Sequence, residues 1–208
     1  MKIIAINASA RANGNTEQVI LRAQERLEAN NIQVEVINIA TKLIHGCIAC
    51  EYCHKKDNTN NECVFKDDIV NEVTKKLREA DGIIVGSPTY YGGITGNLKS
   101  LLDRAFYTNS DLLSNKVALP FVVERRGGGM DALRQIENYF ALASTYLVPT
   151  RYWSVLHGRK IQEVLNDDEG LLNIDFSVES MIKMLAHKDE MKLGEMPWKM
   201  TNFFAKVK

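Results

Sequence analysis

Hydrophobic and polar positions follow two different periods along the chain. Short apolar runs of the kind that form buried strands alternate with longer stretches in which apolar residues recur every three or four positions, as on one face of a helix. Strands are expected over residues 2–6, 33–39, 82–86, 117–123 and 148–156. Helices are expected over residues 15–29, 69–77, 95–106, 130–143 and 178–187. Pro120 is awkward within the fourth strand, because proline has no amide hydrogen to donate to a neighbouring strand.

This order of elements predicts an α/β fold. Five successive strand–helix units give a five-stranded parallel sheet with helices on both faces, a doubly wound architecture. Ligands bind such sheets at the carboxyl ends of the strands, near the point where the strand order reverses. The loops that follow the first, third and fourth strands are therefore the candidates for a functional site.

Length and composition favour one domain with a tail. The chain has 208 residues and is 45% hydrophobic, which is enough for a full core. We expect a single domain over residues 1–187, with a cysteine-rich insertion at 45–64. The tail, 188–208, carries Trp198, Phe203 and Phe204, so it is expected to pack on its own or a partner subunit.

The charge balance excludes some classes of partner. Lys plus Arg and Asp plus Glu number 26 each, giving a formal net charge of zero. Proteins that bind nucleic acid or membrane surfaces depend on a basic excess, so neither partner is expected. No signal-peptide core and no apolar run near 20 residues is visible, which predicts a cytoplasmic protein.

The loop after the first strand is rich in hydrogen-bond donors. Ser9 and Thr16 offer hydroxyl groups, Asn15 an amide and Arg11 a fixed charge, all next to the start of a helix. Helix N-termini bind phosphate through unpaired N–H groups and the helix dipole. The loop contains only Gly14 and lacks the glycines of a pyrophosphate site, which favours a single terminal phosphate. The alternative is an ordinary capped turn.

The loop after the third strand supplies aromatic faces. Pro88 stiffens it, Tyr90 and Tyr91 can stack on a planar ring, and Gly92 with Gly93 let the backbone approach a flat ligand. The first loop and this one would bind the two ends of one nucleotide-like ligand, the phosphate and the planar ring. The alternative is that the tyrosines only pack in the core or an interface.

These two motifs, in this order, closely resemble those of the flavodoxin-like NAD(P)H-dependent FMN reductases and the related iron–sulfur flavoproteins. The resemblance runs from Met1 to about Leu156 and implies the strand order 2-1-3-4-5. It also implies FMN as cofactor, with the third loop at the flavin edge. The residues expected to bind FMN are Ser9, Arg11, Asn13, Gly14, Asn15, Thr16, Pro88, Thr89, Tyr90, Tyr91, Gly92, Gly93, Glu124, Gly127 and Gly128. Arg125 and Arg126 are less expected in that loop, and either meet phosphates of a nicotinamide nucleotide or form a solvated pair.

The resemblance implies a flavin oxidoreductase. It would take hydride from NAD(P)H and pass electrons to a flavin, a quinone, another small acceptor or a redox protein. No catalytic side chain is expected, because the flavin carries the hydride chemistry and the four histidines are scattered. Relatives build the ring pocket partly from a neighbouring subunit, so a homodimer or homotetramer is expected, with Phe106, Tyr107 and the tail as contacts. The alternatives are a flavodoxin-type electron carrier without NAD(P)H turnover, or a phosphate-binding or metal-sensing protein without flavin.

All four cysteines lie within one short segment. Cys47, Cys50, Cys53 and Cys63 form a C-x2-C-x2-C-x9-C motif, and four thiolates at short intervals suit a [4Fe–4S] cluster. The motif resembles that of the iron–sulfur flavoproteins, although its last gap is longer than usual there. Three alternatives stay open: a cluster, free or redox-active thiols, or zinc with help from His45 or His54.

Overall fold

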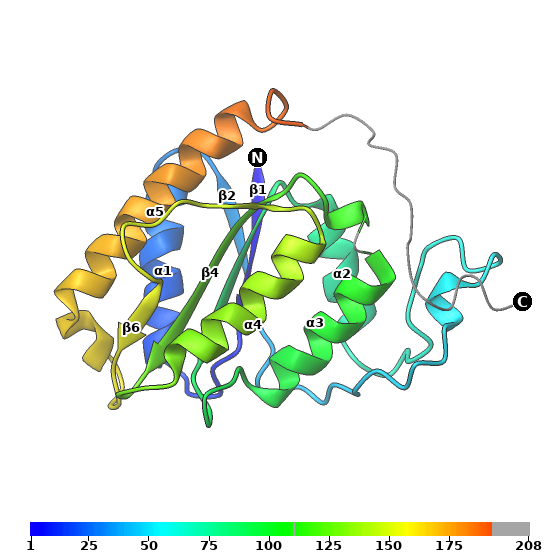
Figure 1. The fold of residues 1–208 in the computed structure, drawn as a ribbon, viewed down its shortest axis with the longest axis horizontal. Coiled ribbons are helices and arrows are strands. Elements are labelled where there is room, and N and C mark those ends of the chain that lie inside the picture. The colour runs from blue at the N-terminus through cyan, green and yellow to red at the C-terminus, as the bar shows by residue number, and fades with distance from the viewer. Residues whose placement is uncertain (110, 193–208) are drawn as a thin grey trace, which may run out of the picture.

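The computed structural model describes residues 1–109 and 111–192, and it contains a layered α/β structure (Figure 1). The strands are β1 (Lys2–Asn7), β2 (Gln33–Asn38), β3 (Gly82–Pro88), β4 (Val117–Glu124), β5 (Tyr146–Leu147) and β6 (Val155–His157). The α-helices are α1 (Asn15–Glu28), α2 (Val70–Glu79), α3 (Gly96–Asn109), α4 (Gly129–Leu142) and α5 (Asp168–His187). Three short 3₁₀ turns are η1 (Tyr52–His54), η2 (Asp111–Leu113) and η3 (Glu163–Asn166). The first four strands and helices agree with the predicted ones to within a few residues.

The strands form one parallel sheet. Its order is β2-β1-β3-β4-β5, and β6 also pairs with β4. This confirms the doubly wound fold and the strand order 2-1-3-4-5 expected from the sequence. The order reverses between β1 and β3, so the loops after these two strands lie side by side at the carboxyl edge of the sheet.

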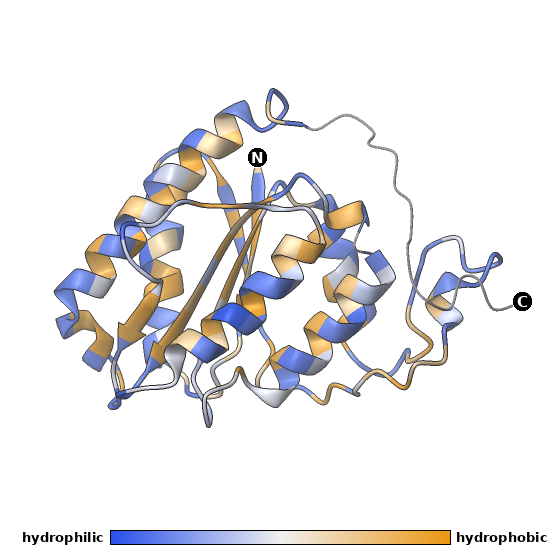
Figure 2. Cartoon of the chain, viewed as in Figure 1, coloured by the Kyte–Doolittle hydropathy of each residue, from blue (hydrophilic) through white to orange (hydrophobic). Residues whose placement is uncertain are grey.

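Side chains of alternate residues in the central strands pack into two separate hydrophobic cores, one on each face of the sheet. Ile4 and Ile6 of β1 face the cluster built with α2, α3 and α4. Ile3 and Ala5 of the same strand face the cluster built with α1 and α5. Because both faces are covered, β4 is buried along its whole length. Figure 2 shows the result as apolar strands between helices whose polar sides face outward.

The fifth strand position differs from the prediction. A single strand was expected over residues 148–156, whereas the structure has two short parallel strands, β5 just before that range and β6 at its end, both paired with β4. The residues between them leave the sheet. The prediction of a fifth strand beside β4 was therefore correct in the strand order but wrong in its bounds, because only Val155 and Leu156 of that range lie in a strand.

Pro120 explains the interruption. Ala118 accepts a hydrogen bond from the Val148 N–H at 3.0 Å, and Val122 donates one to the Ser154 carbonyl at 2.9 Å. Residues 118 and 122 thus direct their backbone groups toward β5 and β6, and by the alternation of a strand so does Pro120, which lies between them. Proline has no N–H to donate, so the strand pairing breaks at this point.

The last helix is longer than predicted. It was expected over residues 178–187, but α5 begins at Asp168. Asp167 caps it, because its Oδ1 accepts a hydrogen bond from the Gly170 N–H at 3.0 Å. The signal was present in the sequence as an aspartate followed by an acidic first turn.

Only the start of the tail lies in the described part of the chain. The Lys188 ammonium forms an ion pair with Asp81, next to the amino ends of the strands. The Tyr146 hydroxyl donates to the Met191 carbonyl at 2.5 Å. Residues 193–208 lie outside the described residues, and with them Trp198, Phe203 and Phe204, so the packing of the tail stays a prediction.

Among the described residues, none of the helices combines the length and the apolar character that a membrane crossing needs. The cytoplasmic location stays a prediction.

Candidate functional site

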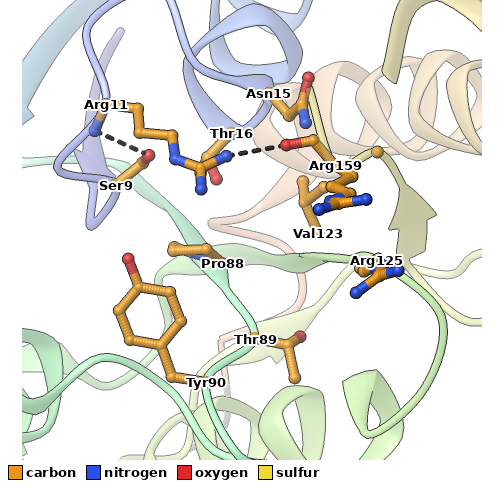
Figure 3. Close-up of a pocket in the computed structure, with 11 residues that line it drawn as sticks. Ser9, Arg11, Asn15, Thr16, Pro88, Thr89, Tyr90, Val123, Arg125 and Arg159 are labelled. Atoms are coloured by element: carbon orange, nitrogen blue, oxygen red, sulfur yellow. Dashed lines mark hydrogen bonds between the residues drawn. The ribbon is translucent and has the colours of Figure 1, made fainter. Parts of the chain in front are cut away.

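A groove opens at the carboxyl edge of the sheet, and we call it the loop groove (Figure 3). It has a volume of about 250 Å³. Eleven residues line it: Ser9, Arg11, Asn15, Thr16, Pro88, Thr89, Tyr90, Val123, Arg125, Gly158 and Arg159. They come from the loops after β1, β3 and β4, as the sequence predicted, and from the segment after β6, which it did not.

The loop after β1 is held by its own hydrogen bonds. Asn7 donates from Nδ2 to Asn38 Oδ1 of β2 at 2.7 Å, and its Oδ1 accepts the Ser9 N–H at 3.0 Å. The Ser9 hydroxyl in turn accepts the Arg11 N–H at 3.3 Å. A side chain at Gly14 would place its Cβ 2.7 Å from the Arg11 carbonyl oxygen, so only glycine fits this turn.

The N-terminus of α1 points free donors into the loop groove. Gly14 is the N-cap residue, and no side chain caps the helix there. Within the described part of the chain, the backbone N–H groups of Asn15 and Thr16 have no hydrogen-bond partner. Both residues are buried and line the groove. Free N–H groups at the positive end of a helix dipole make this end an anion site.

Three arginines surround the same region. Arg11 donates from its guanidinium to the carbonyl oxygen of Arg159 at 2.8 Å, and Arg125 lies beside Arg159 on the same side of the groove (Figure 3). Asn15 also reaches this segment, since its Oδ1 accepts the Val164 N–H at 3.2 Å. The loop groove is therefore electropositive at the end near α1.

The loop after β3 forms the opposite wall. Tyr90 and Gly93 exchange two backbone hydrogen bonds of 2.9 Å, which makes a tight turn with Tyr91 and Gly92 at its tip. Both tip residues have positive φ angles, 52° and 75°. Tyr90 is half-exposed and lines the groove, whereas Tyr91 is fully exposed and does not. Thr89 is fixed by its N–H bond to the Val123 carbonyl at 2.8 Å.

The loop after β4 lines the groove only through Arg125, and its other residues support the other two loops. Glu124 accepts the Gly129 N–H at 2.5 Å at the start of α4, and its other oxygen lies 3.1 Å from His157 Nε2. Gly128 has a φ of 92°, and a Cβ there would lie 3.0 Å from the Gly92 Cα. The third loop thus packs against the turn of the second.

The predicted cofactor residues divide into two groups. Those that line the loop groove are Ser9, Arg11, Asn15, Thr16, Pro88, Thr89 and Tyr90. Those that do not are Asn13, Gly14, Tyr91, Gly92, Gly93, Glu124, Gly127 and Gly128. Their roles in binding stay predictions.

Sequence reasoning missed Gly158 and Arg159. A side chain at Gly158 would place its Cβ 2.7 Å from Asn15 Nδ2, so this segment passes directly over the start of α1. The signal was a glycine and an arginine after the apolar pair Val155–Leu156. It was not found because only the loops after the first, third and fourth strands were taken as candidates for the site.

The four cysteines line a second cavity beside α3, which we call the cysteine pocket. Cys53 is buried, Cys63 is half-buried, and Cys47 and Cys50 are exposed. Burial, reinforced by the neighbouring cysteines, raises the pKa of the Cys53 thiol. In the arrangement described for residues 1–109 and 111–192, no three His, Cys, Asp or Glu side chains are gathered closely enough to hold a metal ion.

Comparison with known proteins identifies the family to which this chain belongs. The sequence matches the NADPH-dependent FMN reductase family over residues 1–160. An iron–sulfur flavoprotein of Methanocaldococcus jannaschii is 35% identical over 196 residues, which cover 89% of this chain and 99% of that protein. The chain belongs to the flavodoxin-like FMN reductase and iron–sulfur flavoprotein family. Membership gives it a general role as a flavin oxidoreductase.

Solved structures agree in fold. RosB with a bound riboflavin-phosphate intermediate superposes with a TM-score of 0.72 at 15% identity, covering 100% of this chain and 94% of that one. An archaeal flavodoxin superposes with a TM-score of 0.57 at 17% identity, covering 90% of this chain and 100% of that one. These two structures thus share the fold described above.

Proposed function

We propose that this family member binds FMN in the loop groove and oxidises NADH or NADPH, passing the electrons to a small acceptor such as a flavin or a quinone. One observation carries the proposal. The uncapped N-terminus of α1 and the Pro88–Tyr90 wall face each other across a single groove (Figure 3). A ligand with a phosphate at one end and a flat ring at the other matches this pair of walls.

The α1 end of the groove would hold the phosphate. The free N–H groups of Asn15 and Thr16 would donate to its oxygens, and the Arg11 guanidinium would add a fixed positive charge. The Ser9 hydroxyl lies on the same wall. This donor set suits a terminal phosphate monoester.

The other end of the groove would hold the ring. The hydroxyl oxygen of Thr89 is buried and has no hydrogen-bond partner in the described part of the chain, so it fits a polar atom of a ligand. Tyr90 offers an aromatic face beside it. Flavin, when bound, supplies the hydride chemistry, and the protein contributes orientation and backbone dipoles.

We further propose that Cys47, Cys50, Cys53 and Cys63 hold a [4Fe–4S] cluster. The donor set fits, because all four thiols line one pocket and thiolates are the ligands that hold iron–sulfur clusters. The relative named an iron–sulfur flavoprotein adds support. The cysteine segment would have to close around the cluster, and free thiols or a zinc site are the competing outcomes.

The proposed assembly is a homodimer or homotetramer. Of the two aromatic residues expected at an interface, Phe106 is buried against Tyr139 and Phe140, and only Tyr107 is half-exposed. Tyr107 is therefore the better candidate for contact with a second copy.

Titration of the apoprotein with FMN, followed by flavin fluorescence, tests the proposed cofactor. Saturable quenching at one FMN per chain is expected, and no binding would overturn the proposal. Anaerobic addition of NADPH or NADH to the FMN complex then tests the reaction. Bleaching of the flavin absorbance supports an enzyme. A flavin that dithionite bleaches but neither nucleotide does would identify an electron carrier instead.

A further inference from the structure

A buried arginine joins the cysteine segment to the folded domain. Arg104 lies on α3 with its side chain 1% exposed, and it pairs with the fully buried carboxylate of Asp68. Its Nη1 also donates to the His45 carbonyl at 3.1 Å. The remaining donor, Nε, points to the Cys63 sulfur at 3.2 Å. One guanidinium thus connects both ends of the cysteine-rich insertion, at His45 and Cys63, with Asp68, which follows it.

The charges of this pair are retained in the folded protein. Burial alone would raise the pKa of Asp68, but hydrogen bonds from Arg104 and from the backbone N–H groups of His45 and Val70 outweigh it and lower that pKa. The guanidinium also stacks over Phe65, with its carbon 5.1 Å from the ring centroid. A charge held in this way, away from water, acts strongly on a sulfur atom in contact with it.

We propose that Arg104 is a positioning residue for the cluster, which donates a charge-assisted hydrogen bond to the Cys63 thiolate and raises the reduction potential of the cluster. The inference rests on the cluster part of the proposed function. When the cluster takes up one electron from a reductant, the negative charge on its iron, sulfide and thiolate atoms increases. A fixed positive donor at one thiolate stabilises that reduced form more than the oxidised form.

The geometry makes the effect specific to one ligand. Arg104 lines the cysteine pocket together with all four cysteines. Its Nη groups are occupied by Asp68 and His45, so only Nε is directed at a sulfur atom. We therefore expect the environment of Cys63 to differ from that of Cys47 and Cys50, which are exposed.

A matched pair of variants tests the inference. Removal of Arg104 alone would leave the Asp68 carboxylate buried without a partner, so both variants carry Asp68→Asn. The first is Asp68→Asn alone, and the second adds Arg104→Met. Each protein is reconstituted anaerobically with iron and sulfide, both are counted, and the potential is measured by a redox titration followed by electron paramagnetic resonance.

The double variant is expected to hold the cluster at a lower potential than Asp68→Asn. The equilibrium constant for reduction should fall about tenfold or more, which corresponds to about 59 mV for one electron. Equal potentials in the two variants would overturn the inference. Arg104→Lys provides an independent measurement, because it keeps a charge but lacks the forked donor. It is expected to lie below wild type, and a wild-type potential in this variant would also overturn the inference.

The experiment distinguishes failure of the proposed cluster from failure of the proposed role of Arg104. If wild-type protein assembles no cluster, the cluster part of the proposed function is wrong and the inference falls with it. If wild type assembles the cluster and its potential is independent of Arg104, only the inference is wrong.

Discussion

The Arg11 guanidinium donates a hydrogen bond to the carbonyl oxygen of Arg159 at 2.8 Å, which joins the loop after β1 to the segment after β6. These two residues are 148 positions apart in the sequence. Their contact fixes the guanidinium at the edge of the loop groove, next to the free N–H groups of α1. Less side-chain freedom is then lost when an anion binds.

Arg11→Met should weaken FMN binding more than riboflavin binding. Loss of a charge-assisted contact to the phosphate is expected to cost about 1.5–3 kcal/mol, or roughly tenfold to a hundredfold in affinity. Arg26→Met, at the far end of α1, is the matched control. Fluorescence titration with both ligands measures the difference, and an equal loss for riboflavin would show that Arg11 does not act on the phosphate.

Tyr90→Leu should weaken flavin binding, whereas Tyr91→Leu should have little effect in a single chain. Tyr90 lines the loop groove and Tyr91 is fully exposed at the tip of the turn. Loss of the aromatic face is expected to cost about 1 kcal/mol. The same titration checks this, preferably with riboflavin, so that the phosphate contributes nothing. A larger loss at Tyr91 would favour the ring contact implied by family resemblance.

Gly158→Ala should destabilise the protein and weaken FMN binding. The added Cβ would lie 2.7 Å from Asn15 Nδ2 and 2.9 Å from the Val164 nitrogen. Such overpacking costs about 1–3 kcal/mol. Urea unfolding of the apoprotein measures the loss. Gly96→Ala is the control, because its Cβ would meet nothing within 4 Å, and unchanged stability of Gly158→Ala would contradict the packing described.

Stability should rise with pH above about 8 because of Lys116. Its ammonium is buried, donating to the carbonyls of Arg78 and Ala80, and burial together with the nearby Lys188 lowers its pKa from 10.5 to about 8. Between these two pH values the unfolded chain binds more protons than the folded one, so the free energy of unfolding increases by up to about 1.4 kcal/mol per pH unit.

Comparison with Lys116→Met isolates this contribution. Urea unfolding at several pH values should give a wild-type curve that rises relative to that of the variant across this window. Parallel curves would show that the pKa of Lys116 is not lowered in the folded protein.

The sequence predicted the fold where the periodicity was strong. Buried strands such as β3 and β4 are continuous apolar runs, and α1 begins directly after the loop that the hydroxyl residues marked. The strand pattern also predicted that the loops after β1 and β3 lie together at the groove. The carboxyl ends of neighbouring parallel strands meet at one edge of the sheet, so the loops that follow them meet there too.

Other features depend on contacts between distant residues. Glu124 was expected to bind the cofactor, and nothing in its local pattern indicated that its carboxylate contacts Gly129 and His157. Gly158 and Arg159 follow a strand of only three residues, too short to show a period. The contact between Arg104 and Cys63 joins residues 41 positions apart, and nothing in the local pattern of either residue indicates it.

The proline in β4 also affects how the protein resists aggregation. An edge strand with a long row of unpaired N–H and C=O groups invites pairing with another chain. Here the outer edge consists of strands of two and three residues, separated where Pro120 provides no donor. A foreign strand would find no continuous ladder to extend on this side of the sheet. The same break that lets the chain leave the sheet before Gly158 therefore protects the open edge of the domain.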